Sequence, residues 1–151
     1  MRKVYYNSIM AHLFLWVKGK STATFFGFIC TKRKKTDPLT LEDINHEAIH
    51  VEQYMEITAA AVILATLLSP WIGWSAWPFI LALTLFYVIY FVEAGISWVW
   101  HSIRRQKAST APMNQAYYNS MFEMEAYANE DNTGYIPARK SFHWLHYIGK
   151  V

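Results

Sequence analysis

A long apolar stretch occupies the middle of this 151-residue chain. Between Ile57 and Trp100, Glu93 is the only side chain with a formal charge, and every Lys and Arg lies before or after that stretch. A soluble domain of this size is too small to cover two such helices on all sides, although a helical hairpin buried in a soluble protein is the alternative. We therefore expect this part of the chain to lie in a lipid bilayer.

Two spans fit the stretch, at residues 55–74 and 78–100, because each supplies the roughly 20 residues that a bilayer-crossing helix needs. Tryptophans cluster at the turn between the spans, and Trp98 and Trp100 lie at the far end of the second one. Indole rings favour the bilayer surface, so these positions mark its two faces. The expected fold class is mainly α: an integral membrane helical hairpin with a short β element.

Basic residues set the expected orientation of the hairpin. The turn near residues 70–78 carries no charge, whereas basic residues flank the apolar stretch on both sides. Since basic flanks stay in the cytoplasm, we expect a multi-pass protein of the cell (inner) membrane with both ends of the hairpin on the cytoplasmic side. Glu93 then falls within the second span and should face the partner helix or a wet cavity. It is either a partner of the functional site or a neutral, hydrogen-bonded structural residue.

The pattern H-E-x-x-H occurs just before the first span, with His46, Glu47 and His50 as its fixed residues. Thr40, with Asp43 three residues later, predicts a capping box at the start of the helix that carries the pattern. On that helix the two histidines share one face, so both imidazoles can bind one metal ion. The carboxylate of Glu47 can reach a metal-bound water and take its proton, as in zinc hydrolases.

The N-terminal region is expected to lie at the membrane surface. Residues 1–20 predict an interfacial helix with Trp16 near the headgroups, and a cleaved signal peptide is the alternative. Residues 21–31 are β-branched and aromatic, which predicts a strand. The four cations at 32–35 suit a solvated turn or an anionic membrane surface. No nucleic-acid partner is expected, because no stacking platform accompanies these cations.

Two further segments follow the spans. Residues 114–132 have helical composition and contain Glu123, and residues 138–148 form a final amphipathic segment. His143 and His146 lie in that last segment, without a carboxylate or a cysteine near them in sequence. We expect them to be surface or interface histidines.

Four carboxylates compete for the place of a third metal ligand beside the two histidines. Glu123 and Glu125 point to opposite sides of a helix, and apolar residues flank Glu123, whereas the side of Glu125 is expected to be solvated. Glu130 shares the face of Glu123 but lies about 10 Å farther along the helix axis. Glu93 is forced into a dry environment but lies too deep in the apolar stretch. The pattern therefore predicts Glu123 as the third ligand.

Together these motifs resemble those of the gluzincin membrane proteases, which include the CaaX prenyl-proteases and the HtpX-type quality-control proteases. The resemblance rests on His46-Glu47-x-x-His50, the apolar hairpin and Phe122-Glu123-x-x-Ala126, in that order over roughly residues 40–130. In that family the second motif is Glu-x-x-Ala-Asp, and its first Glu is the third zinc ligand. The resemblance implies this role for Glu123, and it implies an edge strand that holds extended peptide by β-augmentation.

The chain departs from the family pattern in three ways. Tyr127 stands where the family has Asp, so the residue that orients a zinc histidine is missing or replaced. The segment before Glu123 lacks the usual Arg, and the chain is much shorter, close to a minimal gluzincin. These departures bear on activity more than on metal binding. Tyr127, Arg139 and His143 are the candidates for stabilising an oxyanion, and the sequence does not choose among them.

The predicted function is that of a membrane-embedded zinc metallopeptidase, in one domain over 1–151. Zn²⁺ would be bound by His46, His50 and Glu123, with water in the fourth position and Glu47 as general base. The expected partners are a peptide or membrane-protein substrate and the lipid bilayer. Two alternatives stay open: a non-catalytic zinc-binding membrane adaptor derived from a protease, and a di-iron carboxylate enzyme, which would need a second E-x-x-H that the chain lacks.

Overall fold

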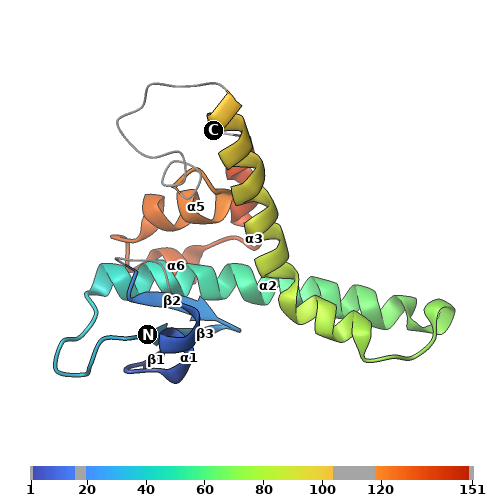
Figure 1. The fold of residues 1–151 in the computed structure, drawn as a ribbon, viewed down its shortest axis with the longest axis horizontal. Helices are drawn as coiled ribbons and strands as arrows, with labels where there is room; N and C mark the ends of the chain where they lie inside the picture. The colour runs from blue at the N-terminus through green and yellow to red at the C-terminus, as the bar shows by residue number, and fades with distance from the viewer. Residues whose placement is uncertain (1, 16–19, 104–117, 150–151) are drawn as a thin grey trace. The chain divides into compact units, whose positions relative to one another are not determined.

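The computed structural model describes residues 2–15, 20–103 and 118–149. Over these residues the fold is mainly helical with one small sheet, which confirms the expected mainly α class with a short β element (Figure 1). In chain order the elements are β1 (Val4–Tyr5), α1 (Ile9–Phe14), β2 (Thr22–Phe25), β3 (Phe28–Thr31), α2 (Leu41–Ile72), α3 (Trp77–Ile103), α5 (Met121–Asn129), α6 (Tyr135–Ala138) and the 3₁₀ helix η1 (His143–Tyr147).

These elements form two compact units. The first comprises Met1–Met55 and Ala126–Ser141, and the second comprises Glu56–Glu125 and Phe142–Val151. Helices α2 and α5 each contribute residues to both units. The assignment of one functional domain to residues 1–151 stays a prediction.

The sheet of the first unit has the strand order β1-β3-β2, with β1 parallel and β2 antiparallel to β3. The prediction of one strand over residues 21–31 is wrong, because the chain reverses at Phe26 and Gly27. Both residues have positive φ, 49° and 80°, as in the tight turns that join antiparallel strands. Strand β2 therefore lies at one edge of this sheet.

The N-terminal part of α2 packs against the sheet. Ile29 of β3 lies in one buried core with Ala48 and Val51 of α2. The predicted capping box is present at the start of the helix: Thr40 N donates to Asp43 Oδ2 at 3.1 Å, and Asp43 N donates to Thr40 Oγ1 at 3.0 Å. These two bonds satisfy N–H groups at the start of the helix, so local sequence fixes where α2 begins.

Helix α1 is shorter than the interfacial helix expected over residues 1–20. It spans 6 residues and buries Ala11. Its exposed large apolar side chains are Ile9, Leu13 and Phe14. Trp16, which was expected near the headgroups, lies outside the described residues. Contact of this region with a membrane surface stays a prediction.

The basic segment 32–35 is only partly solvated. Arg33 donates to the two carboxylate oxygens of Asp37, at 2.8 and 2.6 Å. The hydrogen bond from Arg33 lowers the pKa of the Asp37 carboxyl, and the same bond raises the pKa of Arg33. Lys34 and Lys35 are exposed. The segment thus divides into a cation engaged with a local carboxylate and cations that face solvent.

Within the described residues, two helices are long and apolar enough to cross a membrane, over Leu41–Trp71 and Trp77–Trp100. The first begins well before the span expected at 55–74, because the helix with the histidine motif continues into the apolar stretch without a break. Helix α3 exposes many large apolar side chains, among them Leu81, Leu83, Val88, Phe91, Val92 and Ile96. Apolar surface of this kind is costly in water, so α3 has the composition and the exposure that a lipid environment would suit.

An aromatic cluster forms the core of the second unit. Phe86 and Tyr90 of α3 contact Phe122 of α5 at ring-centroid distances of 4.9 and 6.2 Å. Phe122 also contacts Trp144 of η1 at 5.1 Å. The Trp144 indole in turn donates to the carboxylate of Glu56 on α2 at 3.2 Å. These contacts hold the first turn of α5 in the second unit and bury Phe122.

The C-terminal helices are shorter than expected. Of the helix predicted over 114–132, α5 supplies Met121–Asn129, and residues 104–117 lie outside the described residues. The amphipathic segment predicted over 138–148 contains the end of α6 and the 3₁₀ helix η1. The segment is thus divided between two short elements and is not one amphipathic helix.

Candidate metal centre

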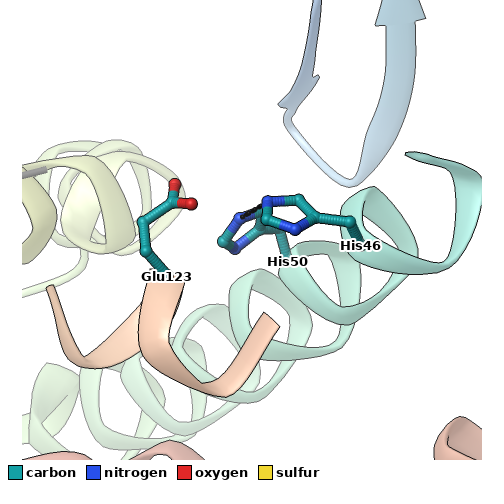
Figure 2. A group of neighbouring side chains, drawn as sticks. All are labelled: His46, His50 and Glu123. Atoms are coloured by element: carbon teal, nitrogen blue, oxygen red, sulfur yellow. Dashed lines mark hydrogen bonds between the residues drawn. The ribbon is translucent and has the colours of Figure 1, made fainter. Parts of the chain in front are cut away.

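His46 and His50 lie one turn apart on α2, and both side chains are buried. Their Nε2 atoms are 3.2 Å apart (Figure 2). Two nitrogen ligands of a tetrahedral zinc ion, each bonded at about 2.0–2.1 Å, would lie about 3.3 Å from one another. The spacing of the two imidazoles therefore matches that of two ligands on one metal ion.

The other ring nitrogen of each histidine has its own acceptor. Nδ1 of His46 lies 2.9 Å from Oε2 of Glu130, and Nδ1 of His50 lies 2.7 Å from Oε1 of Gln53. An ionised carboxylate and an amide oxygen only accept, so these contacts fit rings that donate through Nδ1 and keep Nε2 for another partner. Two Nε2 lone pairs that face one another favour a cation between them, either a shared proton or a metal ion.

Glu123, in the first turn of α5, belongs to the same buried group. His46, His50 and Glu123 each offer one ligand atom, and these three atoms lie within 4.8 Å of one another (Figure 2). Tyr90 of α3 donates its hydroxyl hydrogen to Oε1 of Glu123 at 2.9 Å. Two imidazoles and one carboxylate can hold a metal ion, and this donor set suits zinc or iron(II).

Glu47 lies beside this group on α2 but is not one of its three residues. Its side chain is buried, and Oε2 accepts a hydrogen bond from Oγ1 of Thr24 at 2.9 Å. Thr24 lies on the edge strand β2, so the β2–β3 hairpin orients the Glu47 carboxylate, which the motif places next to His46. This arrangement is compatible with a general base whose carboxylate is oriented by a neutral hydroxyl.

Tyr127 occupies the position where the resemblance calls for Asp. Its ring lies against the ring of His46, with centroids 4.6 Å apart and planes at 63°. Tyr127 contacts His46 through its ring, and the acceptor beside Nδ1 of His46 is the carboxylate of Glu130, three residues later. The sequence indicates Glu130 only as a rival metal ligand and does not predict its contact with His46.

Glu125 differs from its sequence-based expectation. It was expected on a solvated side of the helix, which is wrong, because its relative exposure is 0%. Its Oε1 lies 3.5 Å from Nδ1 of His143 in η1, so packing of η1 covers that side of α5. His143 itself is partly buried and His146 is exposed, as expected of surface or interface histidines.

Glu93 supports the helix that carries Glu123. Its Oε2 accepts from Ser120 Oγ at 2.8 Å, and its Oε1 accepts from Met121 N at 2.7 Å. A carboxylate at the start of a helix satisfies open N–H groups and interacts favourably with the helix dipole. Glu93 is thus hydrogen-bonded, which one of its two expected roles requires, and it ties α3 to the start of α5.

No protein-family model, curated protein or solved structure matches this chain. The likeness to gluzincin proteases accordingly rests on the motif residues and stays a hypothesis. What the chain itself provides is a buried group of His46, His50 and Glu123 with a defined set of neighbours.

Proposed function

We propose that this chain is a membrane-embedded, zinc-dependent metallopeptidase that hydrolyses peptide bonds in a peptide or membrane-protein substrate. The observation that carries the proposal is the pair of Nε2 atoms 3.2 Å apart, each on a ring whose Nδ1 already has an acceptor. A pair so arranged has the geometry for a metal, and the H-E-x-x-H pattern adds a carboxylate next to it.

Each residue of the group has a part in this proposal. His46, His50 and Glu123 would hold the ion, and zinc would supply a Lewis acid that polarises a carbonyl and lowers the pKa of water. Glu47 would accept the proton of the attacking water on its carboxylate and pass it to the leaving amine. Thr24 would keep that carboxylate aligned through its hydroxyl.

The two long apolar helices support a bilayer as the setting for this activity. We place the turn between α2 and α3 outside the cytoplasm and the histidine motif on the cytoplasmic side, since basic residues flank the apolar stretch at both ends. The substrate would then be met at or near the cytoplasmic surface of the membrane.

The proposal is tested with the full-length chain purified in detergent. We expect about one zinc per chain by elemental analysis and cleavage of fluorogenic peptides drawn from a mixed library. Glu47→Gln should keep the zinc and lose at least about 10²-fold in rate, because the general base is removed while the ligands stay. Glu42→Gln, which changes an exposed acid in the first turn of the same helix, is the matched control and should behave like wild type.

The outcomes separate the competing functions. Zinc without hydrolysis in the wild type would favour the non-catalytic adaptor, for which the absence of Asp at Tyr127 is the supporting feature. Iron in place of zinc would overturn the zinc assignment and favour iron chemistry with the same three ligands. Hydrolysis at the wild-type rate in Glu47→Gln would remove Glu47 from the mechanism.

A further inference from the structure

We infer that Glu130 is the residue that positions His46 for metal binding: it fixes the Nδ1–H tautomer and so directs the Nε2 lone pair at the ion. This inference rests on the proposed metal-binding function and assigns it a residue outside the H-E-x-x-H and E-x-x-A patterns. The role is the one that the resemblance gives to an Asp at position 127, where this chain has Tyr.

The contact between the two side chains has the geometry of a charge-assisted hydrogen bond. Oε2 of Glu130 lies 2.9 Å from Nδ1 of His46, and the side chains are 32% and 11% exposed. Water is thus largely excluded from the histidine and partly from the carboxylate. Since an ionised carboxylate has no hydrogen to give, the ring must donate through Nδ1, which leaves Nε2 as the metal-binding atom.

The backbone that carries Glu130 is held in place by the residue next to His46. Nδ2 of Asn45 lies within hydrogen-bonding distance of three carbonyl oxygens, 3.0 Å from Asn129, 2.9 Å from Glu130 and 3.0 Å from Asn132. Asn45 and His46 are neighbours on α2, so the same turn of helix presents the histidine and fixes the chain that bears its acceptor. Because Asn45 holds this backbone, the side chain of Glu130 has less conformational freedom to lose when it bonds to His46.

Two residues share the role that the resemblance gives to an Asp at position 127, which is to orient the His46 ring. Tyr127 packs edge-on against the His46 ring at 4.6 Å and limits its rotation, and Glu130 supplies the acceptor. His50 instead uses the neutral Gln53. The two imidazoles therefore differ at Nδ1, where His46 has a carboxylate oxygen and His50 an amide oxygen, and the carboxylate makes Nε2 of His46 a strong donor to a cation.

Two measurements on the full-length chain in detergent test the assignment. The first is zinc affinity by competition with a chromophoric chelator, for wild type, Glu130→Ala, Glu130→Gln and Asp131→Asn. The second is the tautomer of His46 in the metal-free chain, read from ¹⁵N imidazole shifts with His46→Gln used to assign the signal. Asp131 is exposed and adjacent, so its substitution controls for loss of one negative charge in this segment.

We expect Glu130→Ala to weaken zinc binding by about 10- to 100-fold and to move His46 toward the Nε2–H form. Glu130→Gln keeps an acceptor oxygen, so it should retain the Nδ1–H form and lose less affinity. Asp131→Asn should match wild type. If Glu130→Ala does not fold, as judged by circular dichroism, the comparison of Glu130→Gln with Asp131→Asn decides, because only the first alters the partner of His46.

The failure of this inference is distinguishable from failure of the proposed function. Wild-type protein that binds no zinc would overturn the proposed function, and this inference with it. Zinc bound by wild type and by Glu130→Ala with equal affinity would overturn the inference alone. The inference alone would also be overturned by two results together. These are equal zinc affinity in Glu130→Gln and Asp131→Asn, and a wild-type His46 in the Nε2–H form.

Discussion

Single hydrogen bonds determine which atoms of the candidate metal centre are available to a metal ion. The histidine pair could be predicted from sequence, because residues four apart on a helix share a face whatever the rest of the chain does. Gln53, three residues after His50, lay within reach of the same argument. Glu130 did not, because its bond to His46 joins residues 84 positions apart and depends on tertiary structure. The burial of Glu125 was missed for the same reason. Its carboxylate lies against His143 of η1, a separate element that the sequence of α5 does not reveal.

The hydroxyl of Tyr90 provides a test at this scale. Tyr90→Phe removes the hydrogen bond to Oε1 of Glu123, which otherwise limits the positions that the carboxylate can take. We expect zinc affinity to fall by about tenfold with the fold unchanged, as is typical when the partner of a ligand is lost.

Chelator competition and circular dichroism measure the two quantities for Tyr90→Phe. Tyr87→Phe is the matched control, because Tyr87 lies on the same helix and packs against Phe86. An equal loss of affinity in both variants would show that Tyr90 acts through packing and not through Glu123.

At the scale of the elements, the sequence predicts a helix boundary reliably where the hydrogen bonds that fix it form within a few residues. The start of α2 was predicted correctly from Thr40 and Asp43, because a capping box is made within four residues. The β2–β3 hairpin was missed because the β-branched and aromatic residues on both sides of Phe26-Gly27 resemble one continuous strand. The dipeptide Phe-Gly is also not among the common turns of β-hairpins. β1 spans 2 residues, too few for a pattern, and its pairing with β3 is tertiary.

The capping box gives a prediction for the helix that carries the histidines. Thr40→Ala should lower the free energy of unfolding by about 1 kcal/mol, because Asp43 N loses its side-chain acceptor at the first turn. Thermal and chemical unfolding in detergent measure this change, and Thr40→Ser, which keeps the hydroxyl, should restore most of it. A Thr40→Ser variant as unstable as Thr40→Ala would show that the methyl group and not the cap matters.

At the scale of the whole molecule, composition predicts two long apolar helices, and the part of the chain that the structure describes has two that are long and apolar enough to span a bilayer. Their orientation in a membrane depends on flanking charges and not on the fold, so it has to be tested in cells. Ser75, before α3, and Ser102, near its end, are both exposed and suit cysteine labelling. The native Cys30 is buried and can be replaced by Ser for this purpose.

We expect a cysteine at position 75 to react with a membrane-impermeant maleimide in intact cells, and a cysteine at position 102 to react only after the cells are opened. The basic flanks would hold the second position in the cytoplasm. The opposite labelling pattern would place the metal centre on the other side of the membrane. Labelling of both positions in intact cells would argue against a spanning hairpin.

The bonds of Glu93 also bear on the order in which the chain is made. The ribosome delivers α3 before it has synthesised Ser120 and Met121, whose Oγ and N–H groups later donate to the Glu93 carboxylate. In a bilayer, a span that carries a lone carboxylate is disfavoured by about 3 kcal/mol. Stable insertion of α3 should therefore await the emergence of α5 from the ribosome. Biogenesis of the second span and delivery of Glu123 to the metal centre would then occur together, and a nascent chain cut short before α5 would leave α3 poorly anchored.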